Sequence, residues 1–128
     1  MVEEHVDINI LANIINSDWG NSSMSSGGKT IYSVKAKIIS DSIEVVYTTI
    51  AQFASEDVLR VQMPRYDDEA LQRIDAYVKL MKSKYKEATS TTLTCKQRTT
   101  YANIEMLSMS PYSPVKSAYY RRHVIYDM

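Results

Sequence analysis

The sequence predicts an α+β fold in which a mainly antiparallel β-sheet is packed by one amphipathic helix. Apolar residues recur every three or four positions over 67–87, whereas apolar and polar residues alternate on both sides of that segment. The first pattern is typical of a helix with one buried face, and the second of a strand with one buried face. The expected order is a short helix, a β-hairpin, the long helix and a C-terminal meander. We expect the 128 residues to form a single domain.

A short helical arm is expected over 6–17, where Asp7 fits the N-cap position. The apolar residues at helical spacing are Ile8, Leu11 and Ile15. This face is wide and rich in β-branched residues, so a strand is the alternative. Segment 18–28 is rich in Ser and contains all three Gly of the chain, which predicts a loop.

A β-hairpin is expected over 29–54, with strands at Thr30–Ser40 and Ile43–Phe53 joined by a short polar turn. The residues expected on its buried face are Tyr32, Val34, Ala36 and Ile38 in the first strand, and Ile43, Val45, Tyr47, Ala51 and Phe53 in the second. A further short strand is expected over Val58–Met63 and should end at Pro64, since proline cannot donate to a strand ladder.

The helix over 67–87 is the clearest element of the sequence. Its apolar stripe is Leu71, Ile74, Val78, Met81 and Tyr85. Acidic residues stand at its start and lysines at its end, which suits the helix dipole. Two heptads are too few for a coiled-coil seam, so we expect the stripe to pack on the sheet.

Strands are also expected at Thr91–Thr100, Ala102–Ser110 and Ala118–Asp127, with a proline-rich loop over 110–114. In the last strand, two sets of residues should point to opposite faces. One set is Ala118, Tyr120, Arg122, Val124 and Tyr126, and the other is Tyr119, Arg121, His123 and Ile125.

Charge is distributed unevenly although the net charge is zero. Residues 1–78 hold 12 acidic and 6 basic residues, a net of −6, and residues 79–128 hold 3 acidic and 9 basic residues, a net of +6. This polarity would support head-to-tail self-association or a basic face for an anionic partner. Alternatively, the two halves interleave in space and their charges cancel.

The residues that chemistry would need are absent or isolated. The chain has no glycine loop for phosphate, no nucleophile elbow and no zinc motif, so we expect neither an enzyme nor a bound cofactor or metal. Cys95, in a predicted strand beside Lys96 and Arg98, is the single cysteine. Basic neighbours can lower a thiol pKa, but we expect Cys95 to be an inert packed residue.

No apolar run reaches the length of a membrane span, and the first residues lack the basic start of a secretory signal. With a single cysteine, these features favour synthesis in the cytoplasm and no membrane partner, with later incorporation into a virion compatible with them.

Aromatic and basic residues are interleaved from Tyr112 onward, in a chain with 10 Tyr against one Phe and one Trp. The candidate contact residues are Tyr112, Lys116, Tyr119, Tyr120, Arg121, Arg122, His123 and Tyr126, with Lys96, Arg98 and Tyr101 on nearby predicted strands. Tyr and Arg are enriched at protein–protein hot spots, which favours a non-enzymatic assembly subunit that contacts other protein subunits. A small virion component, such as a phage head–tail or neck protein, would fit.

The same residues also suit single-stranded nucleic acid, because bases stack on aromatic rings while Lys and Arg neutralise phosphates. This is the alternative function, and a plain solvated strand face is the third interpretation. An enzyme whose site is completed by a partner subunit would need a pocket joining Cys95 to His123.

Overall fold

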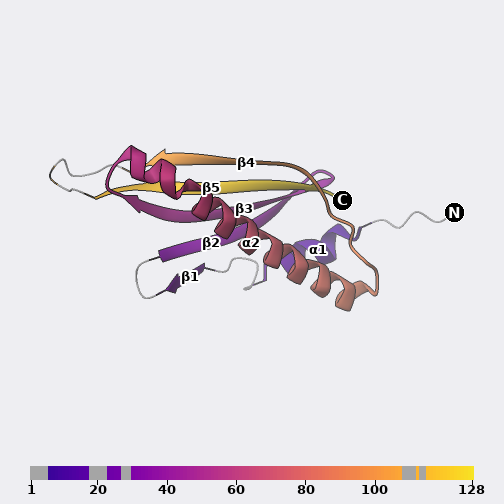
Figure 1. Cartoon of the computed structure of the whole chain (residues 1–128). Helices are drawn as coiled ribbons and strands as arrows, with labels where there is room; N and C mark the ends of the chain where they lie inside the picture. Colours follow the sequence, from indigo (N-terminus) through magenta and orange to yellow (C-terminus); the bar gives the residue numbers. More distant parts are fainter. Residues whose placement is uncertain (1–5, 18–22, 27–29, 108–111, 113–114) are drawn as a thin grey trace.

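The computed structural model describes residues 6–17, 23–26, 30–107, 112 and 115–128, and it confirms an α+β fold with a short N-terminal helix. In chain order the elements are α1 (Ile8–Ile15), β1 (Ser23–Ser26), β2 (Thr30–Ile39), β3 (Ser42–Phe53), α2 (Glu56–Thr89), β4 (Lys96–Met106) and β5 (Lys116–Asp127). The strands form one antiparallel sheet in the order β1-β2-β3-β5-β4. In Figure 1 the long helix α2 runs obliquely along the curved sheet, and α1 lies beside its second half.

The hairpin of β2 and β3 forms as expected, with the predicted apolar residues on its buried side. Ile39 pairs with Ser42, so only two residues form the loop. The first of them, Ser40, has a φ of 56°. A positive φ at this position is what lets a two-residue loop follow the twist of the strands.

Helix α1 also forms as expected, and Asp7 caps it by accepting hydrogen bonds from the backbone N–H groups of Asn9 and Ile10. The backbone N–H of Asp7 in turn donates to the Tyr85 hydroxyl of α2, at 2.9 Å. The first helix is therefore attached to the last turns of the second.

The expected strand at Val58–Met63 is wrong, because this segment is the start of α2. Ser55 caps the helix, which then continues through Pro64. Proline inside a helix removes a backbone donor and disfavours the helix. Core packing offsets this cost, since side chains on both sides of Pro64 pack into the core at helical spacing, among them Leu59, Met63, Tyr66 and Ala70.

The buried stripe of α2 also differs from the predicted one. Leu71 is 42 % exposed, and Ala70 takes its place in the stripe. The buried residues are Leu59, Ala70, Ile74, Tyr77, Val78, Met81 and Tyr85. The helix is longer than expected, so its buried stripe extends further toward the N-terminus. From Ile74 the stripe continues at four-residue spacing to Ala70 and Tyr66, which leaves Leu71 outside it.

The strands expected at Thr91–Thr100 and Ala102–Ser110 merge into one strand, β4, which crosses Tyr101 without a break. It begins only at Lys96 and ends at Met106, and residues 108–110 lie outside the described residues. Strand β5 offers it a partner along this whole length, so the ladder continues. Cys95 stands before β4 rather than in a strand. The predicted loop over 18–28 contains the short strand β1, and the predicted loop over 110–114 lies outside the described residues except for Tyr112.

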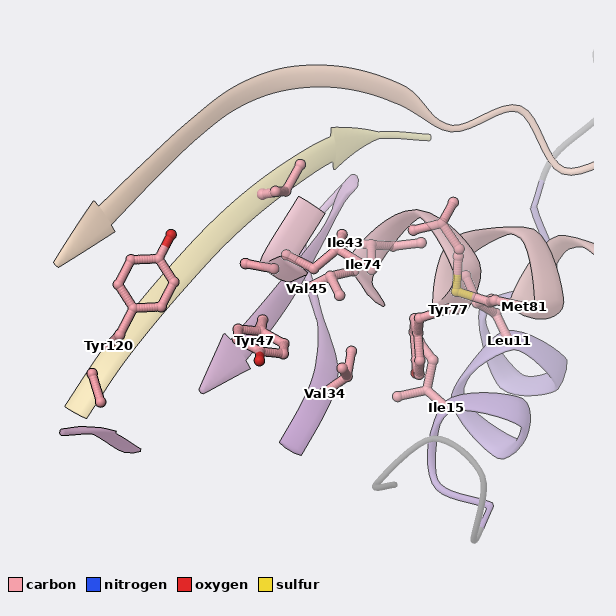
Figure 2. Packing of buried hydrophobic residues seen from close by; sticks show 14 of the residues in the cluster. Leu11, Ile15, Val34, Ile43, Val45, Tyr47, Ile74, Tyr77, Met81 and Tyr120 are labelled. Atoms are coloured by element: carbon pink, nitrogen blue, oxygen red, sulfur yellow. The ribbon is translucent and has the colours of Figure 1, made fainter. Parts of the chain in front are cut away.

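The core lies between α2 and the sheet, as Figure 2 shows. Strand β3 contributes Ile43, Val45 and Tyr47, and the ring centroid of Tyr120 from β5 lies 6.5 Å from that of Tyr47. Leu11 and Ile15 of α1 belong to the same buried cluster as Tyr77 and Met81 of α2. Of the helices in the described ranges, neither is long and apolar enough to cross a membrane.

The corrected stripe gives a direct test of this core. We expect Ile74→Ala to lower the free energy of unfolding by about 2–4 kcal/mol, because it leaves a cavity at a site that is 1 % exposed. We expect Leu71→Ala, on the same helix, to cost less than about 1 kcal/mol. Urea unfolding followed by circular dichroism measures both free energies. Equal losses of stability in the two variants would show that Leu71 packs in the core, against this assignment.

Candidate interaction surface

Strand β5 divides the predicted contact residues between two faces of the sheet. Tyr120, Arg122 and Tyr126 lie on the side of α2 and the core. Tyr119, Arg121 and His123 lie on the opposite side, which we call the open face. Its members on the four long strands include Lys35, Lys37, Glu44, Val46, Thr48, Ile50, Thr99, Tyr101, Asn103, Glu105, Tyr119, Arg121, His123 and Ile125. The core residues of both described helices pack on the other side of the sheet.

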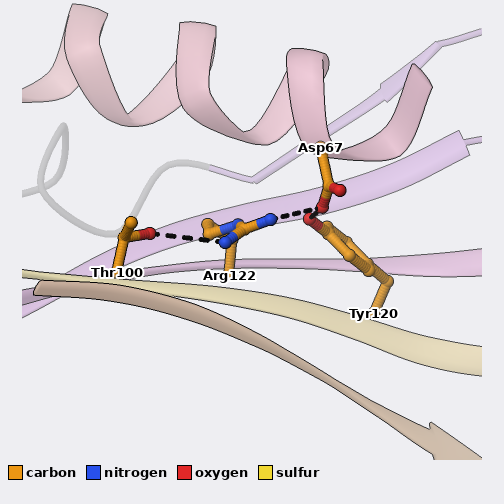
Figure 3. Close-up of polar contacts among 4 residues, drawn as sticks. All are labelled: Asp67, Thr100, Tyr120 and Arg122. Atoms are coloured by element: carbon orange, nitrogen blue, oxygen red, sulfur yellow. Dashed lines mark hydrogen bonds and ion pairs between the residues drawn. The ribbon is translucent and has the colours of Figure 1, made fainter. Parts of the chain in front are cut away.

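On the helix side, the polar candidates hold α2 against the sheet (Figure 3). Asp67 of α2 accepts hydrogen bonds from the Tyr120 hydroxyl and from the Arg122 guanidinium, the latter at 2.6 Å. The same guanidinium also lies within 3.4 Å of the Thr100 hydroxyl. Tyr120 is fully buried, and burial raises the pKa of its hydroxyl, so it stays neutral. The Tyr120 hydroxyl and the Arg122 guanidinium are therefore engaged within the fold.

On the open face, four of the candidates come together. The Tyr101 ring stacks on the His123 ring, with centroids 4.5 Å apart and planes 8° apart. The Arg121 guanidinium lies 5.1 Å from the centroid of the Tyr119 ring. The structure thus assembles an aromatic and basic group from β4 and β5, as the sequence predicted for part of its candidate set.

Residues that were not among the sequence candidates contact this group from both sides. His123 Nε2 lies 2.9 Å from Asn103 Oδ1, and His123 Nδ1 lies 3.5 Å from a carboxylate oxygen of Glu44. The carboxylate of Glu105 accepts from Arg121 at 2.8 Å. Asn103 and Glu105 follow Tyr101 at every second position of β4 and so lie on the same face. This relation could not be predicted while a strand was expected to end before Tyr101.

Each of the three candidate arginines has a carboxylate partner. Arg98 pairs with Asp127 at 3.0 Å, Arg121 with Glu105, and Arg122 with Asp67. The last pair joins the basic and acidic halves of the chain, so part of the charge split cancels in space, as the alternative interpretation expected. These pairs lower the positive potential that the C-terminal strands can present to an anion.

The remaining candidates lie apart from the open-face group. Lys96 pairs in register with Asp127 at one end of β5, and Lys116 pairs with Phe53 at the other end. At ~3.4 Å per residue, the length of a strand separates these two lysines. Tyr112 is 92 % exposed and stands outside the strands.

Strand β4 is exposed along its whole length of 11 residues, on both faces of the sheet. It pairs with β5, and within the described ranges no strand pairs with its other edge. Tyr101, Ile104 and Met106 are 48 %, 37 % and 51 % exposed. Sequence reasoning missed Ile104 and Met106, because their exposure follows from the position of β4 at the edge of the sheet and not from residue type.

Cys95 and His123 gain no support as a reactive pair. Burial raises the pKa of the Cys95 thiol, although Lys82 opposes the shift, so the nucleophilic thiolate is disfavoured. A hollow of about 870 Å³ runs along α2 beside Arg65 and Arg73, and one of about 390 Å³ lies between α1 and α2. Neither is lined by Cys95 or His123. No group of three His, Cys, Asp or Glu in the described part of the chain is placed to hold a metal ion.

Comparison with known proteins finds no match to a family model, to a curated protein or to a solved structure.

The contact between Asp67, Tyr120 and Arg122 predicts a clear difference between two adjacent acidic residues. Asp67→Ala should lower the free energy of unfolding by about 1–3 kcal/mol, since it removes the acceptor of a buried hydroxyl and of a guanidinium. Asp68→Ala, at an exposed neighbouring position, should stay within about 0.5 kcal/mol of the parent. Chemical denaturation measures both, and a similar loss in the two variants would show that the contact does not stabilise the fold.

Proposed function

We propose that this chain is a non-enzymatic assembly subunit that works through protein–protein contacts made by β4 and the adjoining open face. The observation that carries the proposal is the exposure of all 11 residues of β4 at the edge of the sheet. An edge strand presents a row of backbone N–H and C=O groups that another chain can pair with.

Devices that protect an edge from pairing are concentrated at one end of β4. Lys96 and Arg98 stand there, together with an irregularity in register between Gln97 and Thr99. Charged side chains and bulges of this kind discourage edge pairing. From Thr99 to Met106 the strand has no Lys, Arg or Pro, and its one acid, Glu105, is engaged by Arg121. Most of the edge is therefore suited to contact with a partner.

The open face adds side-chain area beside this edge. Tyr119 and Arg121 are partly exposed there, and Tyr101 more so. Aromatic residues and Arg supply much of the energy at protein interfaces. A virion component, such as a phage head–tail or neck protein, would be one assembly of this kind; that narrower identity stays a prediction from the sequence.

Hydrogen exchange and light scattering together test the proposal. When the protein is purified from its source or concentrated, it should form a species with a mass greater than that of one chain, with an interface above about 1,000 Å². Amides of Thr99–Met106 that point away from β5 should exchange more slowly in that species. Amides of β5, which is paired on both sides, are the internal control. A single-chain mass throughout, with no stoichiometric partner and unchanged exchange in β4, would contradict the proposal.

A second candidate is binding of single-stranded nucleic acid on the open face. The observation in its favour is the convergence of Tyr101, Tyr119, Arg121 and His123 on one side of the sheet. Bases can stack on such rings while the guanidinium meets a phosphate. The pair between Arg121 and Glu105 weighs against it, because a phosphate would have to displace a carboxylate.

Fluorescence titration with a labelled oligonucleotide distinguishes this candidate from protein assembly. If nucleic acid binds on the open face, Arg121→Ala should weaken binding and reduce its dependence on salt. Arg60→Ala, an exposed position on α2, is the matched control and should bind as the parent does. No binding at low salt, or equal binding by both variants, removes the candidate.

A further inference from the structure

We infer that the β4 edge pairs in antiparallel orientation with the β4 edge of a second copy of this chain, across a two-fold axis. The inference rests on the proposed assembly function and names its partner. Two sheets would then join edge to edge through their β4 strands; β4 is the uppermost strand in Figure 1.

The lengths of the two sheet edges favour this partner over a head-to-tail arrangement. The other edge strand, β1, has 4 residues, whereas β4 has 11. Pairing of β4 with β1 of a neighbour would leave most of the β4 edge without partners. A second β4 has the same length, and a two-fold axis makes one surface complementary to itself.

The charges of β4 favour the antiparallel orientation. Lys96 and Arg98 stand near its start, and Glu105 near its end. In an antiparallel pair, the basic start of each strand lies beside the acidic end of the other. In a parallel pair, lysine would lie beside lysine and glutamate beside glutamate, which is unfavourable across neighbouring strands.

A register centred on Tyr101 would pair Thr99–Asn103 of one copy with Thr99–Asn103 of the other. A two-fold axis perpendicular to the sheet keeps both open faces on the same side, so opposed residues must share a face. Thr99 and Asn103 meet this condition, since both lie on the open face with Tyr101. Before Thr99 the irregularity in register changes the alternation, so Lys96 lies on the open face with Glu105 and would lie beside Glu105 of the second copy.

Single cysteines placed along β4 test the inference, in the full chain with Cys95→Ser. A residue on the two-fold axis faces its own copy at a separation that a disulfide can span, so Tyr101→Cys should give a covalent dimer on mild oxidation. Thr99→Cys and Asn103→Cys, on the same face, should each give at least roughly tenfold less covalent dimer. Each of these cysteines is separated from its own copy by the length of four residues, at ~3.4 Å per residue. Mixing these two variants should restore the cross-link, since Thr99 then faces Asn103.

The pattern of cross-links decides the outcome. One maximum within Thr99–Asn103, with rescue by a mixed pair placed symmetrically about it, supports antiparallel pairing. Similar yields at Thr99, Tyr101 and Asn103 would indicate parallel pairing or random collision and would overturn the inference. An assembled species with no cross-link in β4 also overturns it, but leaves the proposed assembly function intact. A single-chain mass with no partner overturns both.

A charge exchange provides a second measurement that needs no cysteine. Lys96→Glu or Glu105→Lys alone should weaken the dimer roughly threefold to tenfold, because each places like charges side by side twice across the axis. The double variant should recover most of the affinity. Equal dissociation constants for the single variants, the double variant and the parent in sedimentation equilibrium would overturn the inference.

Discussion

The pairing of β3 with β5 is the contact on which the other elements depend. It runs in register from Ser42 opposite Asp127 to Phe53 opposite Lys116 and forms the middle of the sheet. On one side, these two strands provide most of the apolar surface of the sheet on which α2 packs. Strands β2 and β1 extend the sheet from β3, and β4 extends it from β5. The exposure of β4 is thus a direct result of where β5 inserts.

The two sides of β5 have opposite physical characters. On the helix side, the Tyr120 hydroxyl and the Arg122 guanidinium share Asp67 as an acceptor, so both groups hydrogen-bond within the fold. Nearby, burial raises the pKa of Tyr47 to about 12, with a smaller contribution from Glu69, which keeps this phenol neutral in the core. On the open side, Tyr119 and Arg121 remain partly exposed. One strand therefore both anchors the core and supplies the surface for contacts.

Local patterns in the sequence were enough to predict the hairpin, the cap at Asp7 and the two faces of β5, because each depends on neighbours along the chain. The start of α2 was not predictable in this way, since Pro64 disfavours a helix locally and only packing of Leu59 and Met63 against the core compensates. The continuity of β4 likewise depends on a partner strand. For the candidate surface, residue types indicated Tyr101, Tyr119, Arg121 and His123, but strand order decided that Tyr120 is buried, that Arg122 lies against α2 and that Ile104 is exposed.

The central place of β5 has a consequence for synthesis on the ribosome. Strand β5 is the last described element to be made, yet it lies between β3 and β4, and Ser42 meets Asp127 across a separation of 85 residues. Until β5 emerges, one edge of β3 and both edges of β4 are open, and these edges can pair wrongly. Contacts so distant in sequence also slow folding, because a long loop must close before they form. A chaperone that covers these edges until β5 emerges would prevent such pairing.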